Sequence, residues 1–207
     1  MNLAAFDFDL PENLIALRPA DPQDSARLLV VHGDGRLEDA VVRDLPRYLS
    51  AGDVLVFNDT RVLPAALKGI RPGRGETGTD VACDVNLVER IDSNTWRALA
   101  RPGKRLKPGD TIRFADGFHA LLTQRIDGGE IELSFSQSGA ALEQALDAHG
   151  AMPLPPYIAR RRPADARDRD TYQTSFAGED AASVAAPTAG LHFTPRLLSE
   201  LDAAGLR

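Results

Sequence analysis

The 207-residue chain is poor in cysteine, in basic residues near its start and in long apolar runs. Its one cysteine, Cys83, excludes an intramolecular disulfide scaffold. No stretch approaches the roughly 18 apolar residues that a membrane-spanning helix needs. Residues 1–9 include two acids and no base, unlike the start of a signal peptide. We therefore expect a cytoplasmic protein without a membrane segment.

The common catalytic and metal-binding motifs are also missing. The four histidines and the single cysteine form no His-x-x-x-His or Cys-x-x-Cys pair, so we expect no metal site. The chain has no Walker loop, no glycine-rich dinucleotide fingerprint and no Gly-x-Ser-x-Gly elbow. A function must therefore be sought in less general patterns.

Charge is distributed unevenly along the chain. The net charge is −6, which argues against a protein that coats nucleic acid non-specifically. Residues 1–60 carry −6, residues 61–113 carry +5, and residues 114–207 carry −5. Only the middle stretch could attract a polyanion locally. An ordinary mixed-sign surface is the alternative interpretation.

The first part of the chain predicts a hairpin and a short buried strand. Apolar residues at 27–31 and 37–42 flank a turn at His32–Arg36, which is typical of a β-hairpin. A short helix is expected at 44–49. The apolar run at 54–57 has the length and composition of a buried strand.

Residues 69–138 are predicted to form an inserted β domain. Five short strands separated by turn residues indicate a small antiparallel barrel or sandwich; they span 81–88, 95–100, 111–114, 118–124 and 130–135. The insert would divide a mixed α/β main domain into residues 1–68 and 139–207. The fold class is therefore predicted as α+β.

The last part of the chain predicts two helices joined by loops. Helical spacing begins at residue 139 and ends at 149, with Leu142, Ala145 and Leu146 on one face. A charged loop is expected at 160–170 and a loop of small residues at 183–193. The final helix has Thr194 as its N-cap, Pro195 in its first turn and Gly205 at its end.

A strand usually follows such a capped helix in an α/β arrangement, but only Leu206 and Arg207 remain. We therefore expect the main domain to be incomplete at its C-terminus.

The first polar segment of interest follows the run at 54–57. It consists of Asn58, Asp59, Thr60 and Arg61. Polar groups at the carboxyl end of a buried strand are a common ligand site in open α/β sheets. The alternative is a turn in which the Asn and Asp side chains bind their own backbone.

A second segment, at 152–160, is rich in proline. Tyr157 could stack on a base, and Arg160 could contact phosphate. The alternative is a rigid linker between elements.

A third segment, at 187–193, combines small residues with a histidine. Gly190 would let a ligand approach the backbone, and His192 could transfer a proton near neutral pH. The helix start that follows favours an anionic group. The alternative is a structural histidine beside a capping threonine.

These three segments, in this order, resemble signatures of the S-adenosylmethionine:tRNA ribosyltransferase-isomerases of queuosine biosynthesis. The matching stretches run over almost the whole chain and include Phe8–Pro11, Asp24–Leu29, Phe57–Ala65, Met152–Ile158, Tyr172–Thr174 and Ala185–Phe193. The resemblance implies an α/β domain with an inserted β-barrel. It also implies that relatives continue beyond this chain, which would then be a C-terminally truncated piece whose activity stays an open question.

The resemblance further implies an enzymatic reaction. The ribosyl group of S-adenosylmethionine would be transferred to the aminomethyl-deazaguanine wobble base of tRNA and isomerised, which gives epoxyqueuosine-tRNA, adenine and methionine. S-adenosylmethionine would be a consumed substrate, and no cofactor or metal is implied. The expected partners are the precursor tRNA and S-adenosylmethionine, and we expect a monomer.

The chemistry that this reaction requires suggests roles for residues of the matching segments. His192 and Asp59 are the candidate catalytic residues. The candidate substrate-binding residues are Asn58, Thr60, Arg61, Tyr157, Arg160, Tyr172, Gln173, Thr188 and Gly190. Two alternatives stay open: a non-catalytic tRNA-binding module that uses the basic insert, and a small-nucleotide enzyme that needs no RNA.

Overall fold

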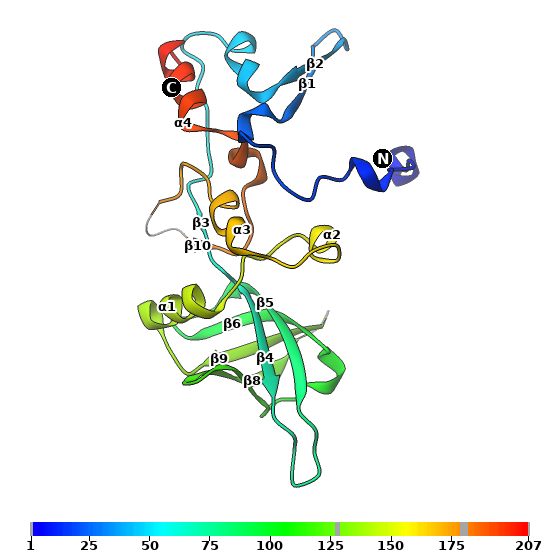
Figure 1. The fold of residues 1–207 in the computed structure, drawn as a ribbon, viewed down its shortest axis with the longest axis vertical. Coiled ribbons are helices and arrows are strands. Elements are labelled where there is room, and N and C mark those ends of the chain that lie inside the picture. The colour runs from blue at the N-terminus through cyan, green and yellow to red at the C-terminus, as the bar shows by residue number, and fades with distance from the viewer. Residues whose placement is uncertain (1, 127–128, 179–181, 207) are drawn as a thin grey trace. The chain divides into compact units, whose positions relative to one another are not determined.

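The computed structural model describes residues 2–126, 129–178 and 182–206 and shows a mixed helix-and-sheet fold (Figure 1). The chain divides into two compact units. One comprises Met1–Val54, Pro156–Pro163 and His192–Arg207, and the other comprises Leu55–Pro155 and Ala164–Leu191. The division into domains at 68/69 and 138/139 stays a prediction, because compact units and inserted domains need not share boundaries.

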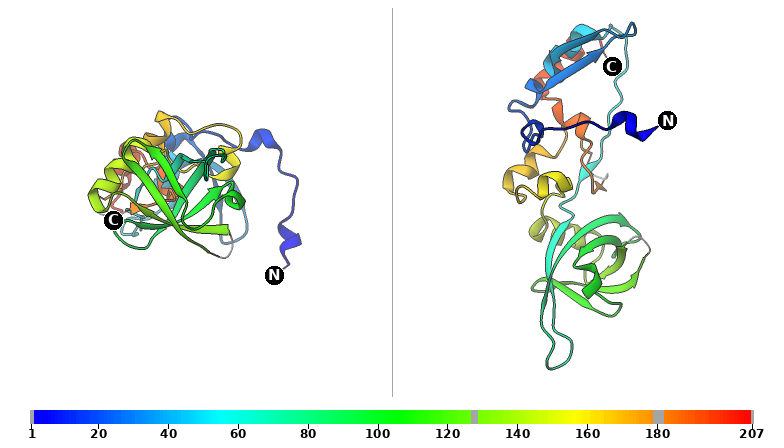
Figure 2. Two further views of the ribbon diagram at one scale, coloured as in Figure 1. Left: turned by 90° about the horizontal axis from the view of Figure 1, so that it is seen from below. Right: turned by 90° about the vertical axis from the view of Figure 1, so that its right-hand side faces the viewer.

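The second unit contains a closed six-stranded antiparallel barrel. The barrel can be followed in Figures 1 and 2. Its strands are β4 (Ala66–Arg71), β5 (Val81–Arg90), β6 (Thr95–Arg101), β7 (Thr111–Ala115), β8 (Phe118–Arg125) and β9 (Glu130–Phe135), in the order β4-β5-β6-β9-β8-β7. The five strands predicted from the sequence, β5 to β9, are confirmed. So is the α+β fold class with an antiparallel barrel.

The sixth strand, β4, was not predicted. It contains Gly69, and glycine inside a strand normally weakens the signal. The barrel explains this glycine, because a Cβ atom there would lie 2.7 Å from Ile112 Cγ2 and 2.7 Å from Phe114 Cδ1. Strand β7 therefore approaches β4 too closely for a side chain at this position.

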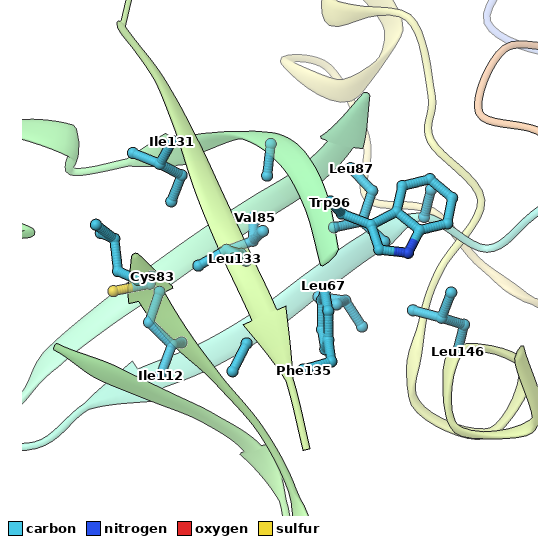
Figure 3. Close-up of a cluster of buried hydrophobic side chains, with 14 of the residues drawn as sticks. Leu67, Cys83, Val85, Leu87, Trp96, Ile112, Ile131, Leu133, Phe135 and Leu146 are labelled. Carbon is cyan, nitrogen blue, oxygen red and sulfur yellow. The ribbon is translucent and has the colours of Figure 1, made fainter. Parts of the chain in front are cut away.

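The barrel core is filled by the inward residues of all six strands. Figure 3 shows part of this cluster, which includes Trp96 of β6 and Leu146 of helix α1 (Gly139–His149). Leu142 and Leu146 are buried and Ala145 packs against them, so the predicted apolar face of α1 is confirmed. Burial of this stripe against the barrel explains why the helix forms here.

The first unit contains the predicted hairpin and the final helix. Strands β1 (Arg27–Val31) and β2 (Leu37–Val41) pair antiparallel, and the 3-10 helix η4 (Val42–Tyr48) follows. Helix α4 (Pro195–Ala203) begins where the sequence predicts, because Thr194 Oγ1 accepts a hydrogen bond of 3.2 Å from the Leu197 N–H. Gly205, with φ +79°, closes it.

The remaining described elements are short. They are the helices α2 (Pro156–Ala159) and α3 (Ala166–Thr171), the strands β3 (Arg61–Val62) and β10 (Ala182–Ser183), and the 3-10 helices η1 (Leu3–Phe6), η2 (Glu12–Leu14), η3 (Gln23–Ser25), η5 (Gly103–Arg105) and η7 (Thr188–His192). Within the described residues, no helix has the length and apolar character needed to cross a membrane.

Two local predictions are wrong. The apolar run at 54–57 forms no strand, and Val54 and Val56 are exposed. A buried strand needs neighbours on both sides, and no described strand pairs with this run. The loop expected at 160–170 instead enters helix α3, whose start is capped when Asp168 Oδ2 accepts a hydrogen bond from the Asp165 N–H (2.9 Å).

Candidate functional site

A small parallel sheet in the barrel-containing unit joins the end of the first singled-out segment to a strand that precedes the third. Strand β3 pairs with β10 in the register Arg61↔Ala182 and Val62↔Ser183. The ladder continues when the Leu63 N–H donates to the Ser183 carbonyl at 2.8 Å. Residues 58–61 therefore lead into β3, and the loop at 184–187 follows its partner strand β10.

The side chain of Gln173 occupies the other side of β3. The Val62 N–H donates to Gln173 Oε1 (3.0 Å), and Gln173 Nε2 donates to the Val62 carbonyl (2.6 Å). The amide thus replaces a neighbouring strand for a residue that is only 1% exposed. This arrangement makes Gln173 a positioning residue for β3, and its contact with substrate stays a prediction.

Tyr172 lies beside this arrangement in a small core. Its ring is buried with Val62 and Met152, and Leu154 and Ala186 pack against the cluster. The cluster therefore joins the proline-rich segment, β3 and the segment before η7 through apolar contact. The substrate-binding role predicted for Tyr172 is not decided by this packing and stays a prediction.

Asn58 and Thr60 form a turn closed by a side chain, which was the alternative interpretation of this segment. Asn58 Oδ1 accepts a hydrogen bond of 2.8 Å from the Thr60 N–H. The Asp59 carbonyl accepts from the Gly178 N–H at 2.7 Å, while the Asp59 residue is exposed. The backbone of this turn is therefore fixed on the Gly178 segment, and the Asp59 carboxylate lies at the surface of its unit.

Arg61 belongs to a charge network on the same unit. Its Nη2 lies 3.6 Å from Glu143 Oε2 on helix α1, and Arg90 Nη2 donates to Glu143 Oε1 at 2.7 Å. Arg90 also lies over the ring of Trp96, with Cζ 5.1 Å from the centroid. Glu143 therefore orients both guanidinium groups. The sequence offered no signal for Glu143 beyond a polar position on a predicted helix.

Gly190 and Thr174 connect the last two signature segments. A Cβ atom at Gly190 would lie 3.1 Å from Thr174 Cγ2, so the small residue permits close packing. Thr174 is buried, and its Oγ1 has no hydrogen-bond partner among the described residues. Thr188 is exposed, and its hydroxyl lies 3.4 Å from the Ala186 carbonyl. Thr174 was not among the predicted site residues, although it ends the segment that contains Gln173.

The other three predicted residues belong to the first unit. Tyr157 is 54% exposed on α2, and Arg160 is exposed directly after that helix. The neighbouring Arg161 donates to the Glu12 carbonyl and pairs with its carboxylate, both at 3.0 Å. The surface of α2 therefore presents an aromatic ring and a cation on a segment tied to Glu12.

His192 ends helix η7 and is half-buried. Two residues later, the Thr194 hydroxyl donates to Asp24 Oδ2 at 2.7 Å, and Arg196 Nη2 donates to the same oxygen at 2.9 Å. The hydrogen bond from Thr194 and the Arg196 charge hold the pKa of Asp24 below its usual value. Asp24 thus fixes the start of α4 immediately after His192.

Asp24 itself was missed as a functional candidate. It is 1% exposed, and its Oδ1 has no hydrogen-bond partner among the described residues. Its only signal in the sequence is its place in the segment 24–29 that carries part of the resemblance. No group of three or more potential metal ligands occurs within the described part of the chain.

The fold and these contacts define a class of protein. It is a mixed helix-and-sheet chain in which the strands of a closed barrel are inserted, in the sequence, between the first singled-out segment and the other two. The family model described as "Queuosine biosynthesis protein" matches residues 3–207. The chain belongs to this family.

Individual relatives are longer than this chain. A protein of Hyphomonas neptunium named S-adenosylmethionine:tRNA ribosyltransferase-isomerase is 73% identical over 207 residues, which is all of this chain and 59% of that protein. A protein of the same name from Maricaulis maris is 54% identical, with 58% of its length covered. The chain therefore spans about three fifths of the length of these curated relatives.

A solved structure is also similar in sequence. The S-adenosylmethionine tRNA ribosyltransferase of Thermotoga maritima is 27% identical, and the match covers 98% of this chain and 55% of that one, with a TM-score of 0.36.

Proposed function

We propose that this chain is the ribosyl-transferring part of an S-adenosylmethionine:tRNA ribosyltransferase-isomerase. In the proposed reaction, the ribosyl group of S-adenosylmethionine moves to the aminomethyl-deazaguanine wobble base of tRNA and is isomerised. The products are epoxyqueuosine-tRNA, adenine and methionine. The observation that carries the proposal is the 73% identity, over the whole of this chain, to a relative with that name.

The arrangement of the barrel-containing unit supports the proposal. Its signature segments are held on one another by the β3–β10 ladder, by the Gln173 amide and by the packing of Gly190 on Thr174. The ladder and the Gln173 amide join segments that lie far apart in the sequence. A shared substrate site is a physical reason for such segments to be fixed together.

The proposed reaction needs three kinds of proton control. The carbon next to the sulfonium must lose a proton to a base, because the adjacent positive charge acidifies it. Adenine needs a proton or hydrogen bonds on its ring nitrogens as it leaves, and the attacking amine must be neutral. We assign His192 to proton transfer and the exposed Asp59 to a weaker acid–base or ribose-hydroxyl role.

The remaining roles concern binding. Tyr157 would stack on adenine or on the deazaguanine, and Arg160 and Arg61 would contact phosphate or carboxylate groups. Asn58, Thr60, Thr188 and Gly190 would shape the substrate loops, with Tyr172 and Gln173 behind them. S-adenosylmethionine is a consumed substrate in this scheme, which uses no metal or separate cofactor. We also propose a cytoplasmic monomer.

Mass spectrometry of the wobble base tests the proposal. The chain is incubated with S-adenosylmethionine and precursor tRNA, and the expected result is a base with the mass of epoxyqueuosine together with free adenine. Salt-sensitive tRNA binding without any base modification would contradict catalysis and support the binding-module alternative. Adenine release without RNA would support the small-nucleotide alternative.

A further inference from the structure

The barrel carries a strongly cationic loop that is not among the segments singled out in the sequence. We define the cationic loop as Arg101–Lys107, which joins β6 to the turn before β7 and includes helix η5. Four of its seven residues are cationic, and none of the seven is acidic. The four cations are Arg101, Lys104, Arg105 and Lys107. All four of these residues are exposed.

Within the described part of the chain, the four cations of this loop form no ion pairs. Among the described residues, none of them forms a side-chain salt bridge or hydrogen bond to a carboxylate. Two other barrel arginines are paired, because Arg90 contacts Glu143 and Arg97 contacts Glu89. The loop is distinguished by four exposed cations within seven residues.

Other side chains hold the backbone of the loop in place. Arg125 Nη1 donates to the carbonyls of Gly103 (2.7 Å) and Leu106 (2.9 Å). Arg74 Nη2 donates to the Arg105 carbonyl at 3.0 Å. These bonds fix three carbonyls, so the loop presents its cations from a preformed backbone.

Two acids adjoin the loop, Asp110 beside its end and Asp84 opposite its start. Asp110 is buried, takes two hydrogen bonds from Arg74 and accepts one from the Lys107 N–H at 2.7 Å. Asp84 faces Arg101 in the β5–β6 register and Lys68 in the β4–β5 register, so it balances charge only at the start of the loop. Positive charge dominates at residues 104–107.

The chemistry of the loop favours a phosphate backbone over a protein surface. Protein interfaces normally have an apolar core, but Leu106, the large apolar side chain of the loop, is fully buried. Phosphate contacts need only accessible cations, and each contact releases counterions. We propose that the cationic loop binds the phosphate backbone of the tRNA substrate. This inference deepens the proposed function, on which it rests.

Salt-dependent tRNA binding tests the loop directly. The 207-residue chain and the variant Lys104→Ala/Arg105→Ala/Lys107→Ala are titrated with precursor tRNA between about 50 and 200 mM salt. The matched control is Lys68→Ala/Arg97→Ala/Arg113→Ala, which removes three exposed cations from strands of the same barrel. Circular dichroism checks that all three proteins are folded.

The expected result is specific to the loop variant. Its affinity for tRNA falls roughly tenfold or more at 100 mM salt, and the slope of log K against log salt decreases by about 2–3, while the control slope changes by less than about 1. Equal effects in the two variants would overturn the proposal, as would a parent chain that binds no tRNA. Base modification is scored separately by mass spectrometry, so a chain that binds tRNA through the loop without modifying it would contradict only the proposed function.

Discussion

Gly190 is a residue whose identity is set by one neighbour. A Cβ atom at this position would meet the Thr174 methyl group at 3.1 Å, which is tighter than ordinary contact. Gly190→Ala should therefore lower the free energy of unfolding by about 1–3 kcal/mol through overpacking. Chemical denaturation of the variant measures this loss.

Thr174→Ser supplies the matched control, because it removes the methyl group and keeps the hydroxyl. In the double variant, most of the loss caused by Gly190→Ala should be recovered relative to Thr174→Ser alone. Additive losses would show that the Thr174 methyl group is not what excludes a side chain at Gly190.

Asp24 makes a pH-dependent contribution to stability. Its pKa is lowered in the folded chain, first by the hydrogen bond from Thr194 and then by Arg196. A depressed folded pKa stabilises the protein fully above the unfolded value of about 3.9, and this contribution is lost as the pH falls through the folded pKa. Asp24→Ala should therefore cost about 1–3 kcal/mol at pH 7 and less at pH 3.

Urea unfolding at the two pH values measures the difference. Asp202→Ala, which removes an exposed acid from helix α4, is the control and should change little at either pH. A loss for Asp24→Ala that is equal at pH 7 and pH 3 would contradict the ionised role of Asp24.

His192 is expected to matter for chemistry more than for binding. Loss of a proton-transfer group typically lowers turnover by about 10²–10⁴-fold. His192→Ala should show this loss in adenine release with unchanged affinity for tRNA. His119→Ala, an exposed histidine on β8, is the control. Parent-like turnover in His192→Ala would refute the assignment.

At the scale of elements, β3 depends on a side chain as much as on a strand. The Gln173 amide satisfies both the N–H and the carbonyl of buried Val62. Gln173→Ala would leave both groups unpaired, so we expect a loss of about 1–3 kcal/mol in stability. Hydrogen exchange at the Val62 amide should accelerate at the same time.

Gln124→Ala is the comparison for this prediction. Gln124 is exposed, and its Nε2 donates to the Glu132 side chain at 2.9 Å, so its removal leaves no buried backbone group unpaired. If both glutamine variants were equally stable, the bonds to Val62 would not stabilise β3.

Elements with strong local signals were predicted well. The hairpin of β1 and β2, helix α1 and the capped start of α4 follow from alternation, helical spacing and the Thr194 side chain. The failures have nonlocal causes. The run at 54–57 has a strand-like composition but no described partner strand. Strand β4 was not predicted because it contains Gly69, a residue that the close approach of β7 requires.

At the scale of the whole molecule, the barrel provides the largest described core. Leu133 is fully buried and faces Trp96 in the β6–β9 register. Leu133→Ala should therefore cost about 2–5 kcal/mol. Trp96 is the single tryptophan of the chain and is itself buried, so its fluorescence reports the unfolding of the barrel.

Leu121→Ala provides the control, because Leu121 is 43% exposed on β8 of the same barrel. Its fluorescence-detected transition should stay close to that of the parent chain. A similar shift for both leucine variants would contradict the assignment of Leu133 to the barrel core.

The candidate site was predictable by residue type but not by contact. The sequence singled out the segments around Asp59, Tyr157 and His192, and the turn at Asn58 was among its stated alternatives. The sequence could not show that the Gln173 amide hydrogen-bonds to the Val62 backbone or that Glu143 pairs with Arg61. Nor could it show that Asp24 accepts a hydrogen bond from the Thr194 hydroxyl. Each of these pairs joins residues more than 80 positions apart.

The sequence by itself therefore determined the elements whose signals are local: five barrel strands, the capped helix α4 and the apolar face of α1. Periodicity and capping act within a few residues, so they can be read without knowledge of the fold. Only the tertiary structure decided how β4 closes the barrel, how β3 pairs with β10 and which polar side chains support the signature segments. These choices depend on distant partners, because buried backbone groups and charges must find hydrogen bonds wherever the fold supplies them.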